Sequence, residues 1–73
     1  MSKNAHAILL TLGKNIRRIR IAQEISQNQL AYETNLSREY INKVESGKYN
    51  ISIKKLNQIA EALDIDIKDF FKD

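Results

Sequence analysis

The fold of this protein is decided by residues 25–47, which read ISQNQLAYETNLSREYINKVESG. Twice in this stretch a serine stands between an apolar residue and a second apolar residue four positions further on: Ile25-Ser26 with Leu30, and Leu36-Ser37 with Ile41. This pattern predicts a helix N-terminus, because the serine caps free backbone N–H groups while the two apolar side chains pack together. Helices are therefore expected to begin near residues 27 and 38, with Gln29 completing a capping box at the first.

A tight turn is expected between these two helices. Asn35 tolerates the left-handed backbone conformation that such a turn requires, and Gly47 is a natural residue to follow the end of the second helix. Two short helices joined in this way form a helix-turn-helix, whose second helix can lie in the major groove of DNA. Ala31 falls where the two helix axes must approach, and the shared core is expected to contain Leu30, Leu36, Ile41 and Val44.

The second helix of this pair presents a polar outer face. Its outward positions are Arg38, Glu39, Asn42 and Lys43. All four side chains can form hydrogen bonds with base edges or with phosphates. The sequence therefore predicts a surface that reads a DNA groove.

The rest of the chain is also expected to be helical. Residues Leu9, Leu12, Ile16 and Ile19 form one apolar stripe of a helix from about residue 8 to residue 23. The capping pattern recurs at Ile51-Ser52 with Leu56 and at Ile65-Asp66 with Phe70, which predicts helices beginning near residues 53 and 67. Proline is absent and the chain lacks alternating β-type runs, so we expect an all-α fold of five helices. Gly13, inside the first helix, indicates close packing against another element.

Length and composition limit the possible classes of protein. The 73 residues suffice for one small domain, residues 1–73, whose single core is marginal unless a partner subunit adds burial. There is no Cys and only one His, His6, so neither a disulfide nor a thiolate metal site is expected. The longest apolar run, Ala7 to Leu10, has four residues, too short for a membrane helix or a signal peptide. We therefore expect a cytoplasmic protein.

Charge is distributed unevenly along the chain. The net charge is +3, but residues 1–55 hold ten Lys and Arg against four Glu, a net charge of +6. Residues 56–73 hold two Lys against five Asp and Glu, a net charge of −3. This asymmetry favours a polyanionic partner for the first three quarters of the chain and a different contact for the C-terminal end, although ordinary solvated faces would also explain it.

The sequence resembles the phage-repressor and Cro-like helix-turn-helix proteins over about residues 9–71. The resemblance is carried by Gly13-Lys14-Asn15-Ile16-Arg17, Arg20, residues 26–31 (SQNQLA), Ile41, Val44-Glu45-Ser46-Gly47 and residues 56–63. Within that family the chain is most similar to the controller proteins of restriction-modification systems, in residues 37–41 and 48–53 and in Phe70-Phe71. Asn35 stands where the family often has Gly, a change that the turn tolerates. The resemblance implies a fold of five helices.

The resemblance also implies roles for individual residues. Gln27 would contact a phosphate at a helix N-terminus. Arg38, Glu39 and Lys43 would face bases, with Arg38 reading guanine, and Asn42 shares their face. For Glu39, orienting Arg38 or favouring the helix N-terminus are alternatives. Further phosphate contacts are expected from Tyr40, Lys48, Tyr49 and Asn50, unless Tyr49 covers the core instead. Arg20 and Glu45 match a structural salt bridge.

The C-terminal end is the expected site of self-association. A symmetric homodimer interface is predicted from Leu63, Ile65, Ile67, Phe70 and Phe71, with the alternative that both Phe rings fill the monomer core. The predicted function is sequence-specific binding of double-stranded DNA by a homodimeric transcription regulator. An antitoxin or protein-interaction adaptor with the same fold is the alternative.

Other chemistry has little support in the sequence. Asp64, Asp66 and Asp69 resemble the start of a calcium loop, but the central Gly and the final Glu of such a loop are missing, which favours helix capping. His6 has no neighbouring ligand or nucleophile, and no phosphate-binding glycine loop is present. We therefore expect neither an enzyme nor a cofactor.

Overall fold

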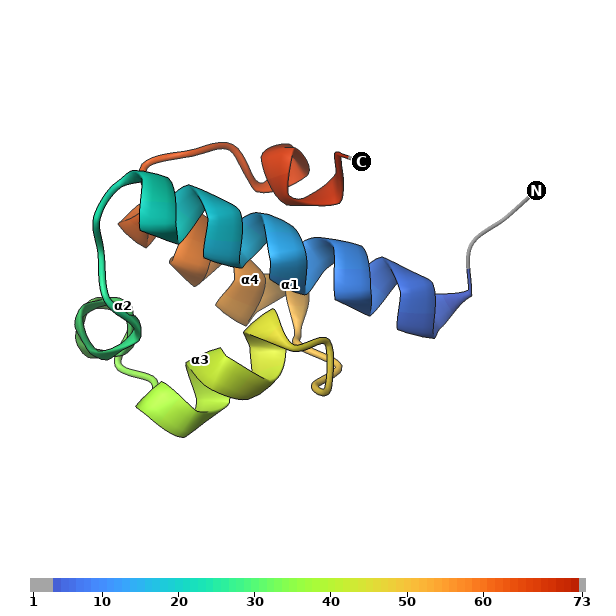
Figure 1. The fold of residues 1–73 in the computed structure, drawn as a ribbon, viewed down its shortest axis with the longest axis horizontal. Helices are drawn as coiled ribbons and strands as arrows, with labels where there is room; N and C mark the ends of the chain where they lie inside the picture. The colour runs from blue at the N-terminus through green and yellow to red at the C-terminus, as the bar shows by residue number, and fades with distance from the viewer. Residues whose placement is uncertain (1–3, 73) are drawn as a thin grey trace.

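The computed structural model describes residues 4–72 and contains helices joined by short turns and loops, with no strand over that range. Its elements are α1 (Ala5–Ala22), α2 (Gln27–Thr34), α3 (Arg38–Glu45), α4 (Ile53–Ala62) and the 3₁₀ helix η1 (Ile67–Phe71). Figure 1 shows α1 as the long central element, with α3 and α4 on one side and η1 on the other. None of the helices in this range is long and apolar enough to cross a membrane. The prediction of an all-α fold is confirmed.

The predicted helix starts at residues 27, 38, 53 and 67 are confirmed. In each case the expected cap accepts a hydrogen bond from the backbone: Ser26 from Gln29 at 3.0 Å, Ser37 from Tyr40 at 3.0 Å, Ser52 from Lys55 at 3.2 Å, and Asp66 from Lys68 at 3.0 Å. The capping box is only half formed. The Gln29 side chain donates to Glu33 at 3.1 Å, one helical turn along its own helix.

Two predictions about the ends of the chain need correction. The first helix begins at residue 5, because Asn4 caps it by accepting a hydrogen bond from the Ala7 N–H at 2.8 Å. The fifth helix is a 3₁₀ segment of five residues, so residues 4–72 contain four α-helices and one 3₁₀ helix. A segment this short closes readily through i to i+3 hydrogen bonds, such as the one from the Asp69 N–H to the Asp66 carbonyl at 2.9 Å.

The chain reverses at residues with a left-handed backbone. Asn35 has φ 58° at the end of α2 and Gly47 has φ 77° after α3, as the sequence predicted. Glu24 at φ 59° and Asp64 at φ 57° adopt the same conformation after α1 and α4. Asp64 and Asp66 thus belong to the turn between α4 and η1. Within residues 4–72, no cluster of His, Cys, Asp or Glu is arranged to hold a metal ion.

A single core connects all the elements. It is formed by Leu12, Ile16, Leu30, Ala31, Ile41, Val44, Ile51, Leu56, Ile59, Ala60, Leu63 and Phe70. The residues predicted for the crossing of α2 and α3 belong to it, with Leu36 packed at its edge. Since α1 contacts both α3 and η1, it forms the framework on which the helix-turn-helix and the C-terminal segment are mounted.

Gly13 marks the closest approach between α1 and α3. A Cβ atom at this position would lie 2.5 Å from the carbonyl oxygens of both Val44 and Glu45. These atoms are backbone, so a side chain there would force the two helices apart. The prediction of close packing at Gly13 is confirmed.

Gly13→Ala is expected to lower the free energy of unfolding by about 1 to 3 kcal/mol, the usual cost of overpacking a close contact. Helix propensity alone would make alanine more stable than glycine here by ~1 kcal/mol. A loss of stability in Gly13→Ala therefore reports the steric clash. Thermal unfolding followed by circular dichroism measures it, with Gln58→Ala on the exposed face of α4 as the control. A Gly13→Ala protein as stable as the wild type would contradict the assigned contact.

Candidate nucleic-acid interface

The outer face of α3 is exposed and polar, as the sequence predicted. Ile41 and Val44 point into the core, and their burial leaves the opposite side of the helix to solvent. A shallow hollow on that side is lined by Arg38, Glu39, Asn42, Lys43, Ser46 and Lys48. The structure therefore brings the four predicted base-contact residues together with Lys48 from the following loop.

A buried ion pair holds α3 against α1. Arg20 Nε donates to Glu45 Oε2 at 2.7 Å and Arg20 Nη2 donates to Glu45 Oε1 at 3.0 Å. The two side chains are only 8% and 3% exposed, and Arg20 Nη1 also donates to the Ile25 carbonyl at 2.8 Å. The predicted salt bridge is confirmed, and its two parallel hydrogen bonds have the fork geometry in which Arg binds carboxylate.

Gln27 takes part in the same hydrogen-bonded network. Its Nε2 donates to Glu45 Oε1 at 3.0 Å, so the first residue of α2 is joined to the last residue of α3. The side chain is half-buried, in contrast to the exposed residues of α3. Contact between Gln27 and a phosphate stays a prediction, and the structure adds an internal role for this amide.

Two tyrosines form a small platform between α3 and the loop that follows it. The rings of Tyr40 and Tyr49 are tilted, with centroids 5.1 Å apart, and both pack at the edge of the core. Lys43 Nζ lies 5.2 Å from the centre of the Tyr49 ring and 3.4 Å from its hydroxyl oxygen. On the other side, Lys55 Nζ lies 5.1 Å from the centre of the Tyr40 ring. The platform therefore holds two lysines by cation–π contact.

The environment of this platform shifts the pKa of one of the two tyrosines. Burial raises the pKa of the Tyr40 phenol, and the neighbouring Tyr49 adds to the shift. Tyr40 is thus a neutral hydrogen-bonding group at physiological pH. The ring of Tyr49 covers the core, which is the alternative that the sequence left open, and its hydroxyl group lies at the surface. Lys48 and Asn50 are exposed beside it, and their contacts with phosphate stay predictions.

The predicted dimer surface needs correction at two of its five residues. Leu63 and Phe70 are 0% exposed because they fill the core beneath α1, where they serve the monomer itself. Ile65 and Ile67 are half-buried, and Phe71 is 46% exposed. Of the two Phe rings, therefore, one completes the core and the other lies at the surface.

Sequence reasoning missed two amides that fasten the C-terminal segment to α1. Asn15 is 8% exposed, and its Nδ2 donates to the carbonyls of Phe70 at 2.8 Å and Lys72 at 2.5 Å. Gln23 Nε2 donates to the Leu63 carbonyl at 2.7 Å. An Asn amid the apolar stripe of a helix was the only signal in the sequence, and it does not reveal a partner more than fifty residues away.

Comparison with known proteins places the chain in a family. Residues 16–70 match the Helix-turn-helix family HTH_3. The chain is 38% identical over 63 residues to the control protein C.BamHI of Bacillus amyloliquefaciens, covering 85% of this chain and 78% of that protein. It is 40% identical over 58 residues to the immunity repressor of Bacillus phage phi105, covering 80% of this chain and 40% of the repressor.

A solved structure agrees with these relatives. The restriction-modification controller protein C.AhdI from Aeromonas hydrophila superposes with a TM-score of 0.86 and 37% sequence identity, covering 89% of this chain and 98% of that one. The protein is thus a member of the helix-turn-helix family of transcription regulators. Among its relatives are a phage repressor and restriction-modification controller proteins.

Glu45→Gln is expected to lower the free energy of unfolding by about 3 kcal/mol or more, because it leaves the Arg20 charge buried without a counter-charge. Chemical denaturation measures the loss. Lys72→Met, which removes the exposed Lys72–Asp69 pair, is the matched control and should have little effect. The double variant Arg20→Met/Glu45→Leu should recover much of the lost stability, since an apolar pair has no charge to desolvate. Equal stability of wild type and Glu45→Gln would show that the pair does not hold the helices together.

Proposed function

We propose that this protein is a sequence-specific regulator of transcription that binds double-stranded DNA as a homodimer, in the manner of a restriction-modification controller protein. The observation that carries the proposal is the hollow on α3, where four exposed polar side chains converge on the outer face of a helix that the buried Arg20–Glu45 pair joins to α1. A helix of this kind fits the major groove, which is about 12 Å wide.

Individual roles follow from position along α3. The N-terminal residues of a recognition helix reach base edges, which assigns base contacts to Arg38 and Glu39, with Asn42 one turn further on. Lys43 is held over the Tyr49 ring at the other end of the hollow. Phosphate contacts are assigned to Lys48, Tyr49 and Asn50 in the loop, to Tyr40, and to Gln27 at the start of α2. Base contacts specify the sequence, whereas the phosphate contacts position the protein on the duplex.

Controller function is supported by relatives of that class that the chain matches over most of their own length. This chain covers 78% of the C.BamHI control protein and 98% of the C.AhdI structure, but only 40% of the phage repressor. Residues 1–73 are proposed to form a single DNA-binding domain. The relatives are named as regulators and controllers, and we propose no catalytic activity. Action in the cytoplasm, where such a protein meets its operator, is part of the proposal.

Homodimer formation is supported by the surface that remains after Leu63 and Phe70 are assigned to the core. Phe71 is an exposed aromatic residue in the same C-terminal segment as the half-buried Ile65 and Ile67. To bind half-sites one helical turn apart on a pseudo-palindromic operator, the dimer has to present its two recognition helices about 34 Å apart.

Arg38→Ala tests the proposed function. A duplex selected from random DNA by the wild-type protein should be bound in preference to a scrambled duplex at moderate salt. Arg38→Ala should lose about 1 to 3 kcal/mol of binding free energy on the selected duplex and discriminate less at one position per half-site. Fluorescence anisotropy on both duplexes gives the two affinities. A wild-type protein without preference for the selected duplex would refute sequence-specific regulation, and equal losses on both duplexes would make Arg38 a phosphate contact.

Phe71→Ala tests the dimer. The wild-type protein is expected to sediment as a dimer at micromolar concentration and Phe71→Ala as a monomer at the same concentration, because the exposed ring supplies apolar contact area across the two-fold axis. Tyr32→Ala, which removes a ring that is 87% exposed on α2, is the control and should leave the dimer intact. A wild-type monomer that binds a single half-site tightly would rule out the dimer, and an unchanged dimer in Phe71→Ala would place the interface elsewhere.

A further inference from the structure

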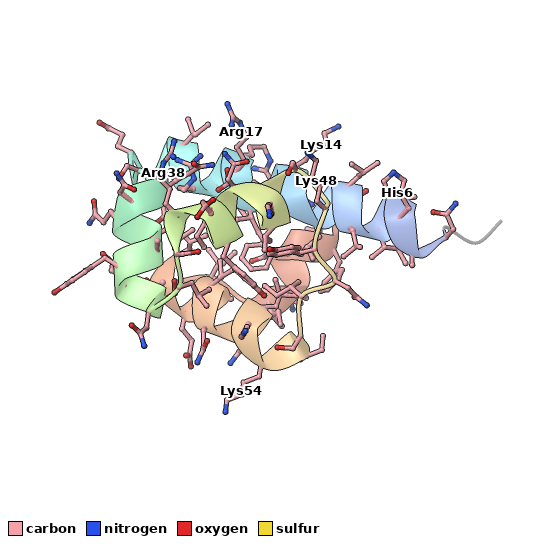
Figure 2. All side chains as sticks on the ribbon, turned by 90° about the horizontal axis from the view of Figure 1, so that it is seen from below. His6, Lys14, Arg17, Arg38, Lys48 and Lys54 are labelled. Carbon is pink, nitrogen blue, oxygen red and sulfur yellow. The ribbon has the colours of Figure 1, made fainter. Side chains whose placement is uncertain are left out.

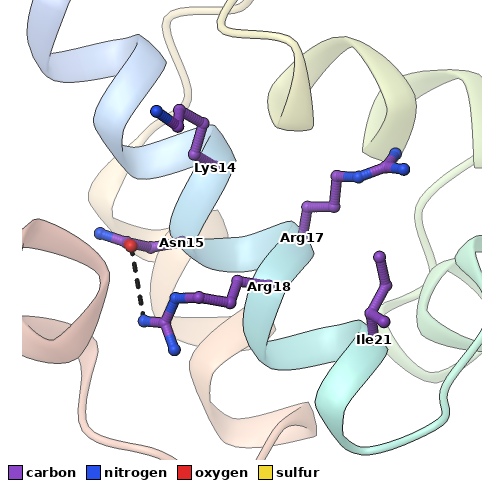
Figure 3. A pocket seen from close by; sticks show the side chains of 5 residues that line it. All are labelled: Lys14, Asn15, Arg17, Arg18 and Ile21. Atoms are coloured by element: carbon purple, nitrogen blue, oxygen red, sulfur yellow. Dashed lines mark hydrogen bonds between the residues drawn. The ribbon is translucent and has the colours of Figure 1, made fainter.

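The outer face of α1 carries a concentration of positive charge that the proposed function has not used. The helix contains Lys14, Arg17, Arg18 and Arg20 and no acidic residue. Arg20 is neutralised by Glu45, and the only other ion pair within residues 4–72 joins Lys72 to Asp69. The first three cations are exposed, and they line a shallow hollow together with Asn15 and Ile21 (Figure 3).

Contacts with α3 and its following loop fix the orientation of this face. A Cβ atom at Gly13 would meet the backbone of Val44 and Glu45, and one at Gly47 would lie 2.8 Å from a methyl carbon of Leu10. Two turns beyond Gly13, Arg20 donates a hydrogen bond to Glu45. The middle of α1 therefore lies directly along the C-terminal end of the recognition helix, without room for sliding.

Arg17 is the cation that this packing directs toward the recognition surface. It follows Gly13 by four residues and precedes Arg20 by three, so it shares the side of α1 that contacts α3. Figure 3 shows Arg17 reaching toward the α3 side of α1, whereas Arg18 extends toward the C-terminal segment, where its Nη2 lies 3.5 Å from Asn15 Oδ1. In Figure 2, Arg17 and Lys14 project toward the same edge of the molecule as Arg38 and Lys48, and Lys54 projects toward the opposite edge.

An element packed beside a recognition helix lies over the border of the groove. An α-helix with its side chains is about 10 to 12 Å across, which nearly fills a major groove about 12 Å wide. A helix packed against it at the usual interaxial distance of about 8 to 10 Å therefore comes to lie above the phosphate backbone. Exposed Lys and Arg side chains on that second helix meet phosphates rather than bases.

We propose that Arg17, assisted by Lys14, binds phosphates of the DNA backbone bordering the groove that α3 occupies. The helix α1 is then a second phosphate-binding element outside the helix-turn-helix, and it widens the footprint of each protomer. This inference rests on the proposed function, because it takes α3 as the helix that enters the groove. Its contribution is electrostatic and equal on all sequences, unlike that of Arg38.

The test is the salt dependence of binding, which counts phosphate contacts. Log affinity falls as log salt rises, and each phosphate contact that is lost makes this negative slope less steep by about 0.9. Since the proposed homodimer carries two copies of each side chain, Arg17→Ala should make the slope less steep by about 1.8 and Arg17→Ala/Lys14→Ala by up to about 3.6, on the selected and the scrambled duplex alike. Between 50 and 200 mM salt, the loss of affinity should therefore be smaller by up to about 150-fold in the double variant.

The matched control is Arg18→Ala/Lys54→Ala, which also removes two positive charges, but from exposed positions that face away from the proposed contact. Its slope should stay near that of the wild type. Arg17→Lys, which keeps the charge, should retain most of the wild-type slope. Unfolding curves for every variant should coincide, since all the altered side chains are exposed.

The possible outcomes separate this inference from the proposed function. If the wild type binds its selected duplex and Arg38→Ala weakens that binding, but the Arg17 and Lys14 variants match the control, the role of α1 is refuted and the function stands. Equal reductions of slope in the α1 variants and in the control would show a general effect of net charge and would also refute it. If the wild type binds no duplex, the proposed function itself fails.

Discussion

The ion pair between Arg20 and Glu45 is the contact on which the rest of the structure depends. Its two charges are almost completely removed from water, so each is stable there only because the other is present at hydrogen-bonding distance. The pair joins the end of α1 to the end of α3, and Gln27 and the Ile25 carbonyl attach the start of α2 to the same point. Three helices are thereby joined by one cluster of hydrogen bonds, which fixes the angle and the position of the recognition helix.

Close contact between backbones complements this electrostatic anchor. At Gly13, α1 meets the last carbonyl groups of α3 at a distance that no side chain would allow. On the other side of α1, Asn15 and Gln23 hold the backbone of the C-terminal segment, so that Phe70 closes the core. In a chain of 73 residues, with neither a disulfide nor a metal cluster in the described part, these polar contacts supplement a small apolar core.

The surface proposed to bind DNA consists of side chains that this packing leaves exposed. The apolar side of α3 is used for the core, and its polar side lies free in a hollow shared with the loop at Lys48. The Tyr40–Tyr49 platform supports that loop and holds Lys43 and Lys55 over its rings. Rigid support from behind and an open polar face in front are what a groove-reading helix requires, because a side chain must be placed accurately to discriminate between bases.

The sequence by itself determined the local structure. Four helix starts, the turns at Asn35 and Gly47, and the inner and outer faces of α3 could be predicted because capping and helical periodicity involve residues within a few positions of one another. The Arg20–Glu45 pair could be predicted from the family resemblance but not from the spacing of residues in the sequence. The tertiary structure decided whatever depends on distant residues: that this pair is buried, that Gln27 joins it, that Asn15 binds the C-terminal carbonyls, and that Leu63 and Phe70 belong to the core and not to an interface. Burial is a property of the whole packing arrangement, and apolar residues near a chain end have the same pattern whether their own core or a second subunit covers them.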